Sequence, residues 1–141
     1  MEQAKVEILV ANPFVERCHI STPLSDMSEK GINVKLVTRQ PSEERKREYL
    51  SKLIKKGVSI TYDSSIHAKV IVVDHCVAIE SSMNFFASSS GGASWEAGLV
   101  TIEKEVVQSI AHSILETQDR MLYQDFKDNC NYCYNGGKRK C

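Results

Sequence analysis

The sequence lacks an excess of charge of either sign, a long apolar run and a secretion signal. Its 141 residues include 18 Lys and Arg and 18 Asp and Glu. No global field therefore draws it to nucleic acid or to a membrane, and any such attraction must be local. The longest apolar runs have the length of a strand and are too short to cross a bilayer. The start, Met1 to Lys5, lacks the basic residues and long apolar stretch of a secretory signal. We therefore expect a cytoplasmic protein with no membrane span.

Cysteines are also few, five in all, and their number is odd. Without a secretion signal, reduced thiols or a metal site are favoured over a framework of disulfides. Cys18 and Cys76 lie in apolar or helical contexts, where we expect reduced and buried thiols.

The other three cysteines, Cys130, Cys133 and Cys141, lie close to the C-terminal end. A Cys-x-x-Cys pair with a third thiol is part of many structural zinc sites, but the tail holds no fourth ligand. Three interpretations stay open: a structural zinc site completed by a partner, a flexible basic tail, or a redox role. The basic residues 138–140 would help nucleic-acid contact in the first two cases. We therefore divide the chain into a folded domain, 1–128, and a Cys-containing basic tail, 129–141.

Segments with strand and helix patterns alternate along the domain, which is long enough to bury a core without disulfides. Apolar and partly β-branched segments predict strands at 6–10, 32–38, 58–62, 70–73, 76–79 and 97–102. Capping residues, terminal charges and apolar spacing predict helices at 22–30, 42–56 and 106 to about 128, with Ser42 as a cap. The opening β-α-β order implies a parallel pair of strands. We predict an α/β fold with a mixed, mostly parallel sheet flanked by helices on both faces.

One short stretch, from Ile66 to Asp74, concentrates groups suited to phosphate chemistry. His67 and Lys69 are two residues apart, so on a strand they project to the same side. An imidazole beside an ammonium suits attack on a phosphate whose oxygens must be neutralised at the same moment. Further polar residues follow at 82, 84 and 96, and sites on α/β sheets usually lie at strand ends and in loops.

The pattern His-x-Lys-x-x-x-x-Asp, formed by His67, Lys69 and Asp74, resembles the signature of the phospholipase D superfamily. Ser82-Met83-Asn84 resembles that family's Gly-Ser-x-Asn segment, with Ser81 in place of glycine. Ser94-Trp95-Glu96 resembles its later Asn-x-Glu, with Ser94 in place of asparagine. The resemblance spans roughly residues 5 to 115 and implies a phosphodiesterase that needs no metal for catalysis.

The resemblance also implies a role for each residue. His67 is the nucleophile that attacks phosphorus, and the phosphohistidine is then hydrolysed by water. Glu96 orients the imidazole, as the carboxylate of a catalytic triad does. Lys69 offsets charge on the phosphate oxygens, and Ser82 and Asn84 add hydrogen bonds to them. Ordinary turn chemistry is the alternative for Ser82 and Asn84, and a solvated loop acid is the alternative for Glu96.

Asp74 belongs to the catalytic signature, yet it lies five residues from Lys69. That separation along an extended strand is too long for the two to share a site directly. We therefore favour a structural role for Asp74 in the turn between two strands.

A second histidine, needed to protonate the leaving oxygen, is missing from the pattern. The other histidines are His19, His75 and His112, and none has a lysine two residues later. In the family, short chains with one signature form a two-fold dimer, so we predict a homodimer with a composite site on its axis.

The chemistry indicates that the substrate is a phosphodiester, but it does not indicate which class of molecule contains that phosphodiester. A nuclease acting on DNA or RNA is favoured by residues 39–56, which hold seven basic and three acidic residues. A phospholipid hydrolase of phospholipase D or cardiolipin type is an alternative, although no amphipathic membrane anchor is evident. A non-catalytic nucleic-acid-binding module is the third interpretation.

Overall fold

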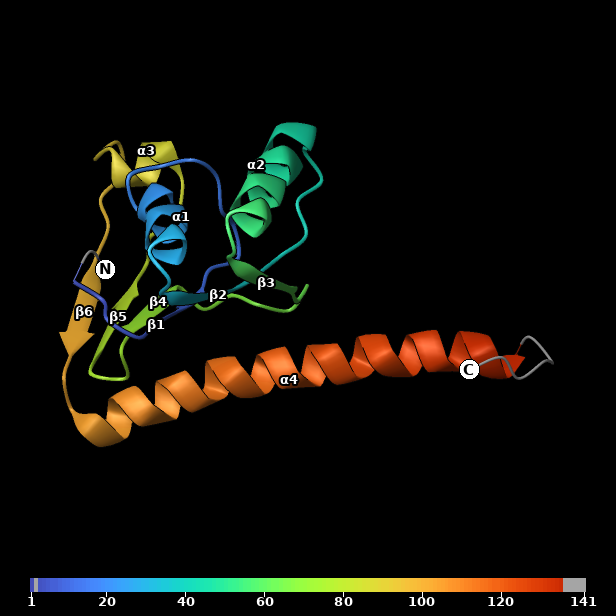
Figure 1. Ribbon diagram of the computed structural model, residues 1–141. Coiled ribbons are helices and arrows are strands. Elements are labelled where there is room, and N and C mark those ends of the chain that lie inside the picture. Colours follow the sequence, from blue (N-terminus) through green and yellow to red (C-terminus); the bar gives the residue numbers. More distant parts are fainter. Residues whose placement is uncertain (2, 136–141) are drawn as a thin grey trace.

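Six strands form one mixed sheet in the computed structural model (Figure 1). The structure describes residues 1 and 3–135, with side chains for 1, 3–89 and 91–122. The strand order across the sheet is β3-β2-β1-β4-β5-β6. The strands are β1 (Glu7–Ala11), β2 (Asn33–Thr38), β3 (Ser59–Tyr62), β4 (Val70–Val73), β5 (Val77–Ser81) and β6 (Gly98–Thr101).

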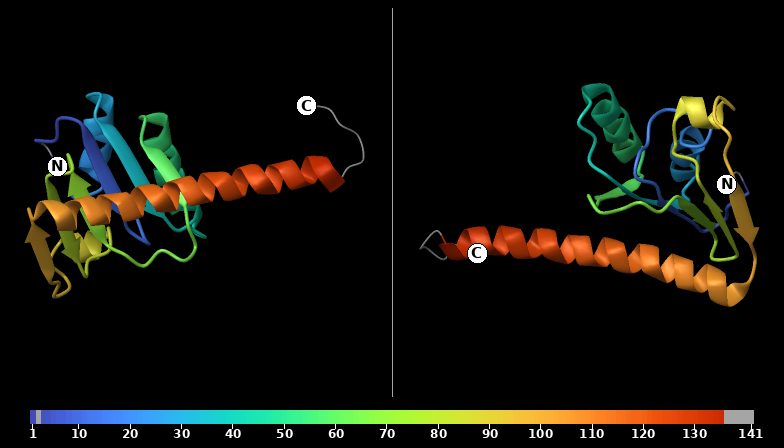
Figure 2. Two further views of the ribbon diagram at one scale, coloured as in Figure 1. Left: turned by 90° about the horizontal axis from the view of Figure 1, so that it is seen from below. Right: turned by 180° about the vertical axis from the view of Figure 1, so that it is seen from behind.

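Helices cover both faces of the sheet, as the sequence predicted. Figures 1 and 2 show α1, α2 and the short α3 on one side and the long α4 on the other. The four helices are α1 (Thr22–Glu29), α2 (Glu44–Lys55), α3 (Ala87–Ser90) and α4 (Lys104–Asn135).

The balance of strand directions differs from the prediction of a mostly parallel sheet. The pairs β1–β2 and β2–β3 are parallel, whereas β1–β4, β4–β5 and β5–β6 are antiparallel. The reason is the length of the connections. The parallel pairs are joined through α1 and α2, while β4 and β5 are joined by a tight turn that only an antiparallel pair can accept.

The core consists of two apolar layers separated by the sheet. Ile8 and Val10 of β1 face α1 and α2, whereas Leu9 and Ala11 face α4. Because successive strand residues point to opposite faces, a continuous apolar run is what a strand covered on both sides requires. The central position of β1 therefore follows from its composition.

Helix α4 packs on the sheet through one stripe of its first half. Val107, Ala111, Ile114 and Gln118 are buried at spacings of three and four residues, which lie on one face of a helix. Arg120 also pairs with Asp63 at 3.2 Å. The backbone of α4 continues to Asn135, past the predicted end near residue 128. Among the described residues, no helix combines the length and apolarity needed to cross a membrane.

Two local expectations are wrong. Ser42 does not cap α2, because Glu43 occupies the N-cap position and makes no side-chain capping hydrogen bond. Cys18 is buried as expected, but Cys76 is exposed, since it lies in the tight turn that joins β4 to β5.

Candidate active site at one edge of the sheet

Five strand ends meet at one edge of the sheet, and the predicted site residues lie there. The register pairs Ala11 at the end of β1 with Val70 at the start of β4. It also pairs Ser81 at the end of β5 with Gly98 at the start of β6, and Ala11 with Val37 near the end of β2. The predicted residues flank these ends, with His67 and Lys69 before β4, Ser82 and Asn84 after β5, and Glu96 before β6.

His67 and Lys69 lie in an irregular segment that leads into β4 instead of on the strand itself. The Lys69 side chain is half-buried, and its Nζ donates to the backbone carbonyl of His67 at 3.3 Å. His67 is exposed, and in the described part of the chain its ring makes no hydrogen bond. The imidazole is thus accessible to a ligand from solvent.

Ser82 and Glu96 contact each other directly. The Ser82 hydroxyl donates to Glu96 Oε2, and it accepts a hydrogen bond from the backbone N–H of Ala97 at 3.1 Å. The Ser82 N–H also donates to the carbonyl of Ala97 at 2.9 Å. Glu96 therefore contacts Ser82 and not His67 in the single chain.

Asn12 joins the end of β1 to the segment that carries Ser82 and Asn84. Its side chain is fully buried, and Nδ2 donates to the carbonyl of Met83 at 3.1 Å. The sequence motif does not include Asn12. The sequence shows an asparagine next to a strand end, but it does not show that the side chain is buried.

Arg39, at the end of β2, was predicted only as one of several basic residues. Its Nε donates to the carbonyl of Ile66 at 2.9 Å, which fixes the residue that precedes His67. The guanidinium also lies over the ring of Phe14, 5.3 Å from the ring centroid. Arg39 is therefore a functional candidate that the motif does not contain.

Asp74 lies at the opposite edge of the sheet, in the turn between β4 and β5, with a φ of 51°. Its carboxylate accepts hydrogen bonds from the N–H groups of Lys5, Val6 and Glu7 at 2.8, 2.8 and 2.9 Å. Desolvation raises the pKa of Asp74, but these N–H groups outweigh it, and the net pKa is lowered. This geometry ties the turn to the start of β1.

Glu7 forms a second polar cluster at that opposite edge. Its carboxylate contacts Lys35 Nζ at 3.1 Å, His75 Nε2 at 2.7 Å and Asn33 Nδ2 at 2.6 Å. Desolvation raises the pKa of Glu7, but the contacts with His75 and Lys35 lower it by more. The net pKa therefore lies below the usual value. The cluster is separate from the edge that carries His67.

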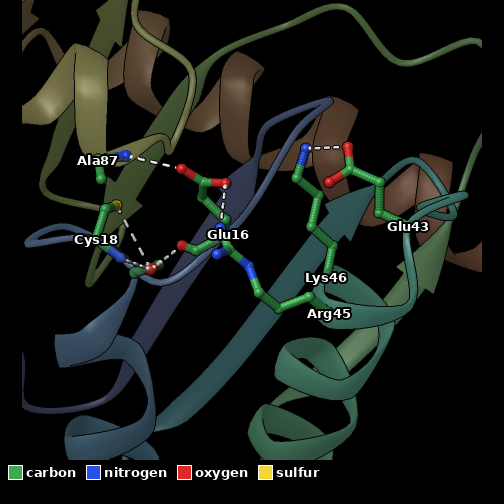
Figure 3. Close-up of polar contacts among 7 residues, drawn as sticks. Glu16, Cys18, Glu43, Arg45, Lys46 and Ala87 are labelled. Atoms are coloured by element: carbon green, nitrogen blue, oxygen red, sulfur yellow. Dashed lines mark hydrogen bonds and ion pairs between the residues drawn. The ribbon is translucent and has the colours of Figure 1, made fainter.

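Two basic residues of α2 pair with acidic residues beside the candidate site (Figure 3). Lys46 Nζ lies 2.6 Å from Glu43, and Arg45 lies 3.9 Å from Glu16. Glu16 also accepts a hydrogen bond from the N–H of Ala87, at the start of α3, at 3.1 Å. The predicted basic surface of α2 is thus partly neutralised at its N-terminal end.

No group of three or more His, Cys, Asp and Glu side chains could hold a metal ion within the residues whose side chains are described. Cys130 and Cys133 fall in the last part of α4, where only the backbone is described, and Cys141 lies outside the described residues. Zinc binding by these three residues stays a prediction.

Comparison with known proteins gives a family match and several similar folds. The family model "Cardiolipin synthase, PLD-like domain" matches residues 1–117. The phospholipase D family member Nuc from Salmonella typhimurium is similar in structure, with a TM-score of 0.74 and 19% identity over 84% of this chain and 81% of Nuc. NucT from Helicobacter pylori has a TM-score of 0.64 and 14% identity over 85% of this chain and 80% of NucT.

A third similar structure is TrmBL2, an archaeal chromatin protein described as having a novel mode of DNA binding. Its TM-score is 0.62 at 14% identity, over 84% of this chain and 45% of TrmBL2. No curated protein matches the chain. At these identities the similar structures establish the fold alone.

Proposed function

Because the chain belongs to the family of PLD-like domains of cardiolipin synthase type, we propose that it is a phosphodiesterase, specifically a nuclease that hydrolyses DNA or RNA without a catalytic metal. The observation that carries the proposal is the convergence of His67, Lys69, Ser82, Asn84 and Glu96 on one edge of the sheet. A cytoplasmic location is part of the same proposal.

In the proposed reaction His67 attacks phosphorus and forms a phosphohistidine as the bond to the leaving oxygen breaks. A histidine of a second subunit donates a proton to that oxygen and then accepts one from the water that hydrolyses the phosphohistidine. His67 is exposed and its ring is free of hydrogen bonds in the described part of the chain, which supports its assignment as nucleophile. Lys69, Ser82 and Asn84 stabilise negative charge on the phosphate oxygens.

Glu96 has the proposed role of orienting the imidazole. Its Oε2 accepts from Ser82, while Oε1 makes no hydrogen bond to any described residue. One carboxylate can therefore hold the serine with one oxygen and accept the imidazole N–H with the other. That arrangement fixes the tautomer of a nucleophilic histidine.

A homodimer is the proposed assembly, because one chain supplies only one histidine of the signature. An exposed apolar patch on and beside β6 supports this assembly. Trp95, Leu99 and Ile102 are 91%, 75% and 76% exposed, and Val100 and Val106 extend the patch. Exposed apolar side chains on an unpaired edge strand mark an interaction site. The patch begins one residue before Glu96, so a partner bound there would adjoin the candidate site.

A phospholipid hydrolase is the second candidate, and the same patch favours it. An exposed tryptophan among aliphatic side chains is also suited to contact with a lipid surface. The name of the matched family, which refers to cardiolipin synthase, is consistent with this candidate. The nuclease is preferred because basic residues, including Arg39 and Lys46, lie beside the candidate site.

The experiment is a substrate panel assayed in the presence of a chelator. Single-stranded and double-stranded DNA and RNA are compared with vesicles that contain cardiolipin. Wild type is assayed beside His67→Ala and, as a control, His112→Ala, which removes an exposed histidine on α4. We expect nucleic-acid cleavage that survives chelation, is abolished by His67→Ala and is retained by His112→Ala. Cleavage of lipid alone would favour the second candidate, and the absence of any cleavage would leave a non-catalytic nucleic-acid-binding module.

A mixing experiment tests the composite site. Wild-type and His67→Ala chains are unfolded together in equal amounts, refolded and assayed. Random pairing with a composite site leaves about a quarter of the wild-type activity, since only pairs of wild-type chains are active. Retention of about half would mean that each subunit acts alone.

A further inference from the structure

A cavity of about 420 Å³ lies beside the edge that carries the candidate site. It is formed where β1 and β2 end and α2 begins, together with the segment after β5. Its floor is apolar and includes Val15 and Leu50. The volume falls in the range of small-molecule sites, which are mostly apolar with a few polar groups in fixed positions.

Two aromatic rings from distant parts of the chain meet in this cavity. Phe14 follows β1 and Phe86 follows β5, and their ring centroids are 5.9 Å apart with an interplanar angle of 28°. Phe14 is 42% exposed, so part of the stacked pair is open to solvent. A planar ligand can therefore contact the exposed part of the Phe14 ring.

Each ring of the pair also lies beside a cationic group. The Arg39 guanidinium lies 5.3 Å from the Phe14 centroid, and Lys46 Nζ lies 5.2 Å from the Phe86 centroid. Lys46 is held in place by Glu43, as Figure 3 shows, and Glu43 also lines the cavity. Arg39 and Lys46 are positive and Glu43 is negative, so the cavity has a net positive charge beside the two aromatic rings.

Two residues of the cavity lining link it to the candidate site. Asn84 lines the cavity and belongs to the Ser82-Met83-Asn84 segment, and its buried Oδ1 has no hydrogen-bond partner among the described residues. Arg39 lines the cavity and donates to the carbonyl of Ile66, next to His67. A ligand bound there lies beside Asn84 and beside the segment that leads to His67.

We infer that this cavity binds the base of a nucleotide adjacent to the phosphodiester that His67 attacks. A base presents a planar π surface to the exposed part of Phe14 and N–H donors to Glu43, while its phosphate lies near Arg39 and Lys46. A base inside a duplex is stacked and paired and cannot enter. The inference rests on the proposed nuclease activity and defines its substrate class as single-stranded nucleic acid, including unpaired ends and loops.

The test compares a single-stranded oligonucleotide with a second one of the same length that has abasic nucleotides around the cleaved bond. The proteins are wild type, Phe14→Leu, Phe86→Leu and the control Phe14→Tyr, which keeps an aromatic ring. Leucine retains apolar bulk, and thermal unfolding verifies that each variant is folded. Wild type should prefer the oligonucleotide with bases by about tenfold in kcat/KM.

Both leucine variants should lose activity on the substrate with bases and keep it on the abasic substrate, so the preference should disappear. Phe14→Tyr should keep the preference of the wild type. Equal cleavage of both substrates by wild type would overturn the inference and leave the nuclease proposal intact. A wild-type preference that both leucine variants retain would also overturn it. Failure of wild type to cleave either substrate would instead reject the nuclease, and this inference with it.

Discussion

The side-chain amide of Asn12 donates a hydrogen bond to the backbone carbonyl of Met83, 3.1 Å away and 71 positions along the chain. Its Oδ1 accepts from the N–H groups of Phe14 and Phe85 at 3.2 and 3.4 Å. One buried side chain thus joins the end of β1 to the segment that carries Ser82 and Asn84. Any change in this residue reaches the candidate site through the backbone.

Asn12→Ala should therefore lower both stability and activity. The substitution leaves the Met83 carbonyl and the Phe14 N–H without their partner, whereas the Phe85 N–H keeps its hydrogen bond to the Phe14 carbonyl at 3.1 Å. The two lost partners cost about 3 kcal/mol of unfolding free energy. Urea denaturation measures this loss. Asn33→Ala is the matched control, because the Asn33 side chain also donates one hydrogen bond, to Glu7, but Asn33 is exposed at the opposite edge. A loss no larger than that of the control would contradict the role of Asn12.

The order of the elements could be predicted from the sequence because each strand and helix carries a local signal. The run of apolar residues in β1 and the charge pattern of α2 needed no tertiary information. The motif around His67 also gave the family, which the match over residues 1–117 confirms. Strand direction was less predictable, because the direction of β4 relative to β1 depends on packing across the sheet.

The surroundings of the site could not be predicted, because they are made by contacts between residues far apart in the chain. Phe14 and Phe86 meet only after β1 and β5 are placed in one sheet, and no local pattern indicates their contact. The Ser82–Glu96 hydrogen bond likewise depends on the pairing of β5 with β6. The residues of the motif other than Asp74 therefore lie at one edge, but the motif does not indicate the side chains that hold them there.

Glu96 and Ser82 should differ in their effect on catalysis although they contact each other. If Glu96 orients His67, Glu96→Gln should lower kcat by about 100-fold, because an amide cannot stabilise the charged imidazole. Ser82→Ala should act more weakly and mainly on KM, since it removes one neutral hydrogen bond. Steady-state kinetics on a cleaved substrate separates the two effects. Glu103→Gln, a change at an exposed glutamate after β6, is the control and should leave kcat unchanged.

The apolar patch on β6 should be required for assembly. Leu99→Arg places a charge in the middle of the patch, where burial against a second copy would carry a large desolvation cost. We expect a monomer by sedimentation that remains folded, with little remaining activity. Leu122→Arg, at an exposed apolar residue of α4, is the control and should remain dimeric. A Leu99→Arg protein that stays dimeric would show that the subunits associate elsewhere.

Asp74 should contribute stability that depends on pH. Its pKa in the folded chain is lowered from the ordinary value of 3.8, so the carboxylate stabilises the fold fully above that value. The contribution is lost as the pH falls through the lower folded pKa, because protonation weakens the hydrogen bonds from Lys5, Val6 and Glu7.

The substitution Asp74→Asn separates the stability that Asp74 contributes from that of the carboxyls of Glu7 and Asp63, whose pKa values are also lowered. At neutral pH the variant should unfold about 2 kcal/mol more easily, since one neutral oxygen replaces a carboxylate that holds three N–H groups. The difference between wild type and variant should shrink as the pH falls below 3.8, the ordinary pKa, because the wild-type side chain then becomes neutral as well. Urea denaturation at a series of pH values measures the difference, with Asp119→Asn on the exposed face of α4 as the control. A difference that stays constant down to the acid limit would mean that Asp74 acts through its shape and not through its charge.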